Sequence, residues 1–186
     1  ADKVMLLDED KIKNLKIESD VILPVIVGTD PGKYSKIAPT TYAIYPYKIQ
    51  DNETKIISEV ELKKKYPNAY GYLLENKKIL QDRKDSRKTF RDRKDWYGLV
   101  RFGTLENFHS EKIVTPGEVK DHKFTIDNSK SGFLAARIFC VIVTDKQYDL
   151  KYVLAILNSN VMKFFLHSTS PLKKGGYYGY SSSYLD

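Results

Sequence analysis

The sequence predicts an α+β fold with a mixed or antiparallel sheet and two substantial helices. Short β-branched runs bounded by turn residues recur in both halves of the chain. Two longer segments carry apolar residues at helical spacing behind a capping residue. No internal repeat and no linker-like stretch divides the 186 residues. We therefore predict a single domain over residues 1–186.

Two short strands are expected near the start of the chain. Residues 21–27 are strongly β-branched, and Pro24 among them favours an edge strand or a bulge because proline cannot donate a ladder hydrogen bond. Residues 28–32 form a turn signal, and residues 42–47 a second short strand with a terminating proline. The apolar residues of segment 6–17 are spaced too irregularly to predict a helix.

The first long helix is expected after Ser58. Ser58 and Glu61 have the spacing of a capping box, in which each side chain satisfies a backbone amide of the other residue. Pro67 interrupts the pattern and Asn68 can cap a second start, after which apolar residues recur at roughly helical intervals over residues 69–84. The basic segment beyond is therefore expected to be the fraying end of this helix and a loop.

The second half of the chain is predicted to begin with strands and to continue with a helix. The expected strands cover residues 96–102, 112–116, 122–126 and 133–144. Asp149 then caps a helix over residues 150–167, one broad face of which is apolar. The segment 168–184 is rich in Gly, Ser and Tyr.

Positive charge is densest in residues 82–95, where seven basic side chains lie among four acidic ones. The net charge of +7 favours a polyanionic partner, because each phosphate neutralised by Lys or Arg releases counterions. The segment leads directly into aromatic residues, but such a charge run is also typical of a solvated, salt-bridged face. The candidate nucleic-acid contacts here and after the first turn are Lys33, Lys36, Lys88, Arg91, Arg93, Trp96, Tyr97 and Arg101.

A second basic and aromatic segment lies near the end of the chain. Its glycines free the backbone to approach a phosphate chain, and its tyrosines offer flat faces and hydroxyl donors. The alternative is a flexible terminal segment. The candidate contacts are Lys173, Lys174, Gly175, Gly176, Tyr177 and Tyr178.

The residues that commonly support catalysis do not form a pattern in this sequence. The three histidines (His109, His122 and His167) lack metal-ligand spacing and are predicted to be surface or strand-end residues. Cys140 lies in an apolar run, which indicates a buried small hydrophobe and a reducing compartment. No phosphate-binding loop and no set of convergent carboxylates is evident. We expect no catalytic residues, no metal and no cofactor in these residues.

The chain is expected to be cytoplasmic and to be part of a larger polypeptide. No opening stretch resembles a signal peptide, and no uncharged apolar run reaches transmembrane length, so no membrane partner is expected. The sequence begins on Ala1 without an initiator methionine.

Seven short segments, in order along the chain, resemble the TaqI-like C-terminal specificity domain, the target-recognition domain of adenine-N6 DNA methyltransferases and of fused type IIG restriction-modification enzymes. The segments are residues 23–28 (LPVIVG), 42–47 (with YPY), 66–76, 96–101 (WY with Arg101), 112–116 (KIVTP), 152–159 (with LAILNS) and 175–178 (GGYY). Arg101, Gly175, Gly176, Tyr177 and Tyr178 match the family motif directly. The residues after Gly28 and after Arg101 depart from it, and residues 86–95 look like an insertion.

The resemblance implies a target-recognition-domain-like fold that recognises specific double-stranded DNA sequences and positions a separate adenine-N6 methyltransferase domain of the same polypeptide. That domain would bind S-adenosylmethionine and flip the target adenine out of the stack. The parent would be a bacterial defence protein, a site-specific methyltransferase or type II restriction enzyme. Two alternatives stay open: a module that binds single-stranded nucleic acid or RNA through its tyrosines, and a protein-interaction domain with a basic face.

Overall fold

The computed structural model describes residues 2–27, 31–85, 88–133 and 138–180. It combines helices with small antiparallel sheets, which confirms the predicted α+β class. The chain forms two compact units, the first made of Ala1–Val25 and Thr40–Phe108, and the second of Ile26–Pro39 and His109–Asp186. The single domain over residues 1–186 stays a prediction.

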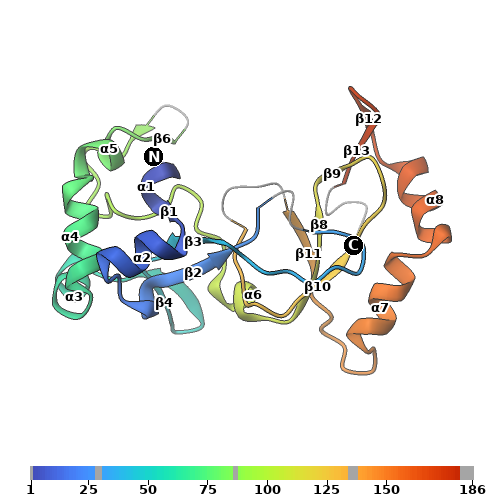
Figure 1. Ribbon diagram of the computed structural model, residues 1–186, viewed down its shortest axis with the longest axis horizontal. Coiled ribbons are helices and arrows are strands. Elements are labelled where there is room, and N and C mark those ends of the chain that lie inside the picture. The colour runs from blue at the N-terminus through green and yellow to red at the C-terminus, as the bar shows by residue number, and fades with distance from the viewer. Residues whose placement is uncertain (1, 28–30, 86–87, 134–137, 181–186) are drawn as a thin grey trace. The chain divides into compact units, whose positions relative to one another are not determined.

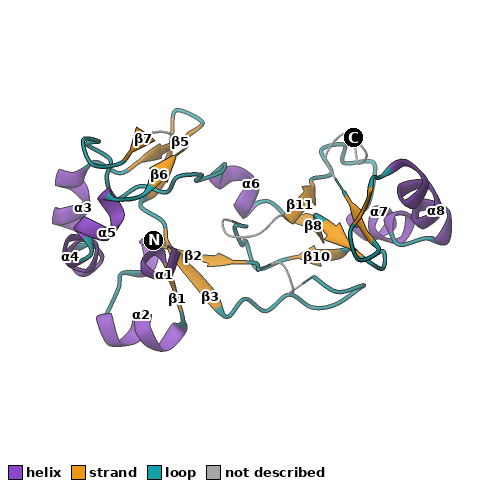
Figure 2. Ribbon diagram, turned by 90° about the horizontal axis from the view of Figure 1, so that it is seen from above, coloured by secondary structure: helices purple, strands orange, loops and turns teal. Residues whose placement is uncertain are grey.

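Unit 1 contains a three-stranded antiparallel sheet in the order β1–β3–β2, and Figure 2 shows β2 and β3 side by side. Its strands are β1 (Leu6–Leu7), β2 (Ile22–Val25) and β3 (Thr41–Ile44). Pro24 lies in β2 at the edge of this sheet, as its missing N–H requires. The short helices α1 (Asp2–Met5) and α2 (Glu9–Leu15) and the 3-10 turn η1 (Ser19–Val21) complete this part of the chain. The seven-residue α2, begun by an Asp8 cap, is too short to give a clear apolar period.

Three helices cover the same unit, namely α3 (Glu59–Lys65), α4 (Pro67–Glu75) and α5 (Lys77–Gln81), and Figure 1 shows them in succession. The predicted Ser58 cap is confirmed, since its hydroxyl accepts from the Glu61 N–H at 3.3 Å. The single helix expected over 69–84 is wrong in two respects. The first observed helix, α4, begins at Pro67, so Asn68 lies inside it and is not its cap. The helical segment then breaks at Asn76, beyond which α5 begins. The Glu18 carboxylate, about fifty residues away, accepts from the Asn68 and Ala69 N–H groups.

Two hairpins complete the strands of unit 1. They are β4 (Tyr47–Gln50) with β5 (Glu53–Ile56), and β6 (Lys84–Asp85) with β7 (Lys88–Thr89). The basic segment is therefore partly a hairpin, which corrects the expected fraying helix end. The strand expected over residues 96–102 is also wrong, because Trp96 and Tyr97 lie in a turn and residues 98–102 form bends and irregular backbone. The short helix α6 (Leu105–His109) follows.

Unit 2 contains two three-stranded antiparallel sheets, ordered β10–β8–β11 and β12–β13–β9. The bounds are β8 (Lys112–Pro116), β9 (Glu118–Val119), β10 (Thr125–Asp127), β11 (Ile138–Val141), β12 (Leu172–Lys173) and β13 (Tyr177–Gly179). The predicted strand over 112–116 is confirmed at both ends. The strand expected over 122–126 is shorter and shifted to Thr125–Asp127. The strand expected over 133–144 ends at Val141, and residues 134–137 of that prediction lie outside the described ranges.

The helix expected over 150–167 is in fact two helices, α7 (Leu150–Leu157) and α8 (Asn160–Thr169). Asp149 caps α7 as predicted, and Ser159 caps α8 by accepting from the Met162 N–H at 3.1 Å. Asn158 between them is buried and binds both backbone groups of Phe124. This long-range pair fixes the break and packs α7 on the core of unit 2, whose members include Ile113, Phe124 and Leu166.

No helix within the described residues is both long enough and apolar enough to cross a membrane.

Candidate functional site

Arg101 is exposed on the loop over residues 98–104 of unit 1. The backbone of this loop is anchored at Leu99 and at Phe102. The Tyr47 hydroxyl accepts a hydrogen bond from the Leu99 N–H at 2.7 Å. The Tyr45 hydroxyl donates to the Phe102 carbonyl at 2.8 Å. The loop thus presents Arg101 to solvent from a short backbone span held at both ends.

Aromatic packing supports the same loop. The Tyr47 ring stacks on Phe102 with centroids 4.8 Å apart and planes 17° apart, and Tyr45 lies 4.7 Å from Tyr47. Tyr45 also contacts the edge of Phe108 at 6.0 Å. Gly103 turns the chain with φ +64° directly over that Phe108 ring, where a Cβ would collide with it. No local pattern in the sequence marks these anchors, although the YPY residues carry part of the family resemblance.

Trp96 and Tyr97 belong to the hydrophobic core of unit 1, which corrects their place among the candidate contacts. They are 3% and 2% exposed, and Lys77 lies 4.8 Å from the Trp96 ring. The Tyr97 hydroxyl donates to the Ile57 carbonyl at 2.7 Å, and burial raises its pKa to about 12. Their side chains stabilise the unit and are not available for direct contact with a nucleic acid.

The basic segment 82–95 makes many of its contacts internally. Arg83 is buried, with its guanidinium donating to the carbonyls of Leu80 and Trp96. Arg91 pairs with Asp82 at 2.8 Å.

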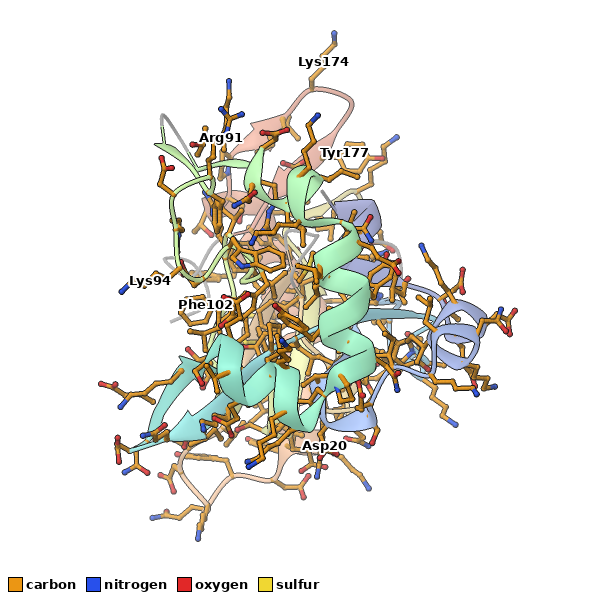
Figure 3. The ribbon with its side chains drawn as sticks, turned by 90° about the vertical axis from the view of Figure 1, so that its left-hand side faces the viewer. Asp20, Arg91, Lys94, Phe102, Lys174 and Tyr177 are labelled. Carbon is orange, nitrogen blue, oxygen red and sulfur yellow. The ribbon has the colours of Figure 1, made fainter. Side chains whose placement is uncertain are left out.

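Arg93 lies 4.1 Å from the Phe90 ring and binds both oxygens of Asp95, and this ion pair lowers the pKa of the Asp95 carboxyl. Arg91 and Arg93 therefore form a salt-bridged face, which is the alternative to a nucleic-acid contact that the charge pattern of this segment also predicts. Such exposed pairs contribute about 0–1 kcal/mol, so a phosphate can compete for them. Lys94 points outward (Figure 3). The strand β7 contains Lys88, whose side chain lies outside the described part of the structure.

The second candidate segment forms a hairpin in unit 2, so the flexible-tail alternative is wrong for residues 171–180. The Gly176 N–H donates to the Lys173 carbonyl at 3.2 Å, and Gly175 and Gly176 have φ +82° and +76°. Glycine adopts this left-handed backbone without a steric cost. Lys174 is exposed at the turn, and its side chain extends away from the ribbon in Figure 3.

The hairpin separates its two tyrosines by role. The Tyr177 side chain is 39% exposed, and the Lys120 ammonium lies 5.0 Å from its ring. Tyr178 faces the other way and stacks on His167, with centroids 3.8 Å apart and planes 9° apart. Lys173 pairs with Glu118 across the sheet at 2.7 Å. Lys174 and Tyr177 are thus the candidate contacts, and Tyr178 anchors the hairpin.

His122 is buried, which corrects its prediction as a surface or strand-end residue. Its Nδ1 is 2.9 Å from the Tyr180 hydroxyl, and its Nε2 contacts the Leu157 carbonyl. The carbonyl can only accept, so Nε2 carries the proton and Nδ1 accepts from Tyr180. Burial lowers the pKa of His122, so the ring is held neutral. Of the other two, His167 is half-buried and His109 is exposed.

Lys33 and Lys36 are exposed on a loop that is bound to the sheet of unit 2. The Tyr34 N–H donates to the Phe124 carbonyl at 3.1 Å, and the Ser35 carbonyl accepts from the Thr125 hydroxyl. Lys36 lines an open cavity of about 650 Å³ beside Lys151. These contacts place two more basic side chains on an ordered surface.

In the part of the chain that the structure describes, no three His, Cys, Asp or Glu side chains gather closely enough to hold a metal ion.

Comparison with known proteins identifies related sequences. The family described as the TaqI-like C-terminal specificity domain matches residues 23–186. The type II restriction enzyme and methyltransferase RM.Eco57I of Escherichia coli is 30% identical over 138 residues, which are 71% of this chain and 14% of that protein. The type II methyltransferase M.BstVI of Geobacillus stearothermophilus is 22% identical over 185 residues, which span this chain and 30% of that protein. The chain therefore corresponds to a minor part of the relatives it matches.

Proposed function

This chain belongs to the TaqI-like C-terminal specificity domain family, and on that premise we propose that it recognises specific sequences in double-stranded DNA. In this role it positions a separate adenine-N6 methyltransferase domain, joined to it in a longer polypeptide, on the target site. The observation that carries the proposal is the family match over residues 23–186.

The loop that displays Arg101 suits base recognition. A guanidinium presents two parallel N–H donors, which match the O6 and N7 acceptors of guanine in the major groove. Discrimination of this kind needs a side chain held on a fixed backbone, because a freely moving arginine loses entropy when it binds. Arg101 is exposed between two anchored residues, which supports this role.

The hairpin suits contact with the DNA backbone. Lys174 supplies a positive charge, and the glycine turn beside it has no side chains that would keep a phosphate away from the backbone. Lys33 and Lys36 add charge on the same unit. Contacts of this kind provide affinity and orientation without reading sequence.

The parent protein is proposed to be a methyltransferase of a restriction-modification system, as the names of both relatives indicate. Its catalytic domain would bind S-adenosylmethionine and transfer the methyl group to an adenine flipped from the duplex. The described residues contribute recognition to this reaction, and the methyl transfer takes place on the separate domain.

Selection from a pool of randomised duplexes tests the proposal. The 186-residue chain is expected to enrich a defined motif at low salt. Arg101→Ala should relax one position of that motif, whereas Lys88→Ala should weaken binding to all sequences about equally.

Competition with single-stranded DNA and RNA tests the alternative, in which Tyr177 would serve as a stacking platform. Failure of the chain to enrich any duplex motif, or preferential release by single strands, would contradict double-stranded recognition.

A further inference from the structure

Two tyrosine hydroxyls bind the backbone on either side of Arg101, and this arrangement points to a role beyond packing. We propose that Tyr45 and Tyr47 are positioning residues, which fix the loop over residues 98–104 so that Arg101 is directed at one base pair. This inference rests on the proposed function. It adds that sequence discrimination depends on two phenolic groups that themselves touch no DNA.

The contacts leave the Arg101 backbone little freedom. The Tyr47 hydroxyl lies 2.7 Å from the Leu99 nitrogen and 3.5 Å from the Leu99 oxygen, so it engages both backbone groups of that residue. Tyr45 holds the Phe102 carbonyl at 2.8 Å. Only Val100 and Arg101 lie between the two anchors, and both are exposed. A span of two residues cannot be displaced far while both ends are bound.

The two rings brace each other as well as the loop. They belong to Tyr-Pro-Tyr, in which Tyr45 and Pro46 lie between β3 and β4 and Tyr47 begins β4, and both tyrosines are buried. The Tyr47 ring stacks on Phe102, so the residue after Arg101 is held through its side chain as well as its carbonyl. Burial raises the pKa of both phenols, that of Tyr47 to about 12, so both hydroxyls keep their protons at neutral pH.

Tyr97 offers a matched control in the same unit. It too is a buried tyrosine whose hydroxyl donates to a backbone carbonyl, that of Ile57 at 2.7 Å. Its partner lies outside the loop of residues 98–104. Replacement of Tyr97 by phenylalanine therefore removes an equivalent buried hydrogen bond without releasing the Arg101 backbone.

The experiment compares Tyr45→Phe, Tyr47→Phe, Tyr97→Phe and Arg101→Ala with the unchanged 186-residue chain. A duplex carrying the motif enriched from the randomised pool and a duplex of scrambled sequence serve as probes. The readout is the ratio of the two dissociation constants, measured at one salt concentration, with chemical denaturation of each variant alongside. Phenylalanine keeps the rings and their stacking, so only the hydroxyl contacts are tested.

The expected result is a loss of discrimination for the loop variants alone. Arg101→Ala should lower the ratio about 10-fold, as for one lost bidentate base contact. Tyr45→Phe and Tyr47→Phe should lower it about 3-fold each through weaker binding of the motif duplex, with unchanged affinity for the scrambled one. Tyr97→Phe should leave the ratio unchanged even if it lowers stability.

The outcomes separate this inference from the proposed function. If Arg101→Ala lowers the ratio while both loop tyrosine variants retain it, the positioning role is wrong and duplex recognition stands. Equal losses in Tyr97→Phe and the loop variants would reduce the effect to general destabilisation and also overturn the inference. If the unchanged chain binds both duplexes alike, the proposed function itself fails.

Discussion

At the scale of single residues, the pair formed by Lys112 and Asp127 is the most strongly buried charge contact of the described chain. The two side chains are fully buried and lie 2.8 Å apart on the paired strands β8 and β10. Asp127 also accepts from the backbone N–H groups of Ser129 and Ser131. The pair is therefore fixed in place by a network, and neither charge can reach water.

Removal of one charge from this pair is predicted to destabilise the protein strongly. Asp127→Asn should lower the free energy of unfolding by about 3–5 kcal/mol, because the buried Lys112 ammonium loses its counter-charge. Urea denaturation followed by circular dichroism measures the change. Asp121→Asn is the control, since Asp121 is 78% exposed and its pair with Lys163 should contribute about 1 kcal/mol or less. A loss below that of the control would show that the buried pair is not needed for stability.

Local signals in the sequence predict the role of a residue when its hydrogen-bond partner lies within a few positions along the chain. Ser58 and Asp149 were predicted as caps because each binds amides two or three residues away. Glu18 caps α4 from about fifty residues away, and no local pattern marks it. The basic neighbours of Trp96 indicate an exposed position, whereas its burial depends on core residues that lie far away in the sequence.

At the scale of elements, the hairpin β12–β13 depends on a histidine that must stay neutral. His122 accepts from Tyr180, which directly follows β13, and donates to Leu157 at the end of α7. Burial lowers the pKa of His122 below that of an exposed histidine. The unfolded chain therefore takes up a proton near pH 6.5 that the folded chain resists. Stability present above that pH is lost as the pH falls through it.

Burial lowers the pKa values of His122, His167 and His109, and the most deeply buried of them, His122, is predicted to contribute most to the pH dependence of stability. The free energy of unfolding should fall between about pH 7 and pH 5, and His122→Gln should flatten that slope. Denaturation at a series of pH values provides the measurement. His109→Gln, at an exposed position, should alter the slope less. An unchanged slope in His122→Gln would assign the dependence to other groups.

Among the elements, the strand β8, which local composition marks, was predictable, whereas elements whose limits depend on long-range contacts were not. β8 runs over the predicted residues because its run of apolar and β-branched residues lies between turns. The predicted helix over 150–167 carries a continuous apolar face, so no local pattern marks its division. The division follows from Asn158, whose side chain binds Phe124 about thirty residues away. The irregular backbone of residues 98–102 likewise depends on Tyr47, which lies far away in the sequence.

At the scale of the whole molecule, positive charge occurs in both units but much of it is already paired. Arg91, Arg93 and Lys173 each have an acidic partner in the described structure. Lys33, Lys36 and Lys174 lie on ordered turns with exposed side chains. These ion pairs leave the net charge of +7 unchanged, but they lower the number of basic side chains that can bind a phosphate without displacing an acidic partner. The number of phosphate contacts therefore has to be measured.

The salt dependence of duplex binding supplies that number. The logarithm of the association constant should fall linearly with the logarithm of salt concentration, by about 0.9 for each phosphate neutralised. Lys174→Ala should reduce the magnitude of this slope by about 0.9 if its exposed ammonium contacts one phosphate. Fluorescence anisotropy with one duplex at several salt concentrations measures the slope. Lys55→Ala is the control, because Lys55 pairs with Asp51 at 2.8 Å on the β4–β5 hairpin and should leave the slope unchanged. Equal slopes for Lys174→Ala and the unchanged chain would show that Lys174 of the hairpin contacts no phosphate. A smaller slope in both Lys174→Ala and Lys55→Ala would indicate a diffuse electrostatic attraction without defined contacts.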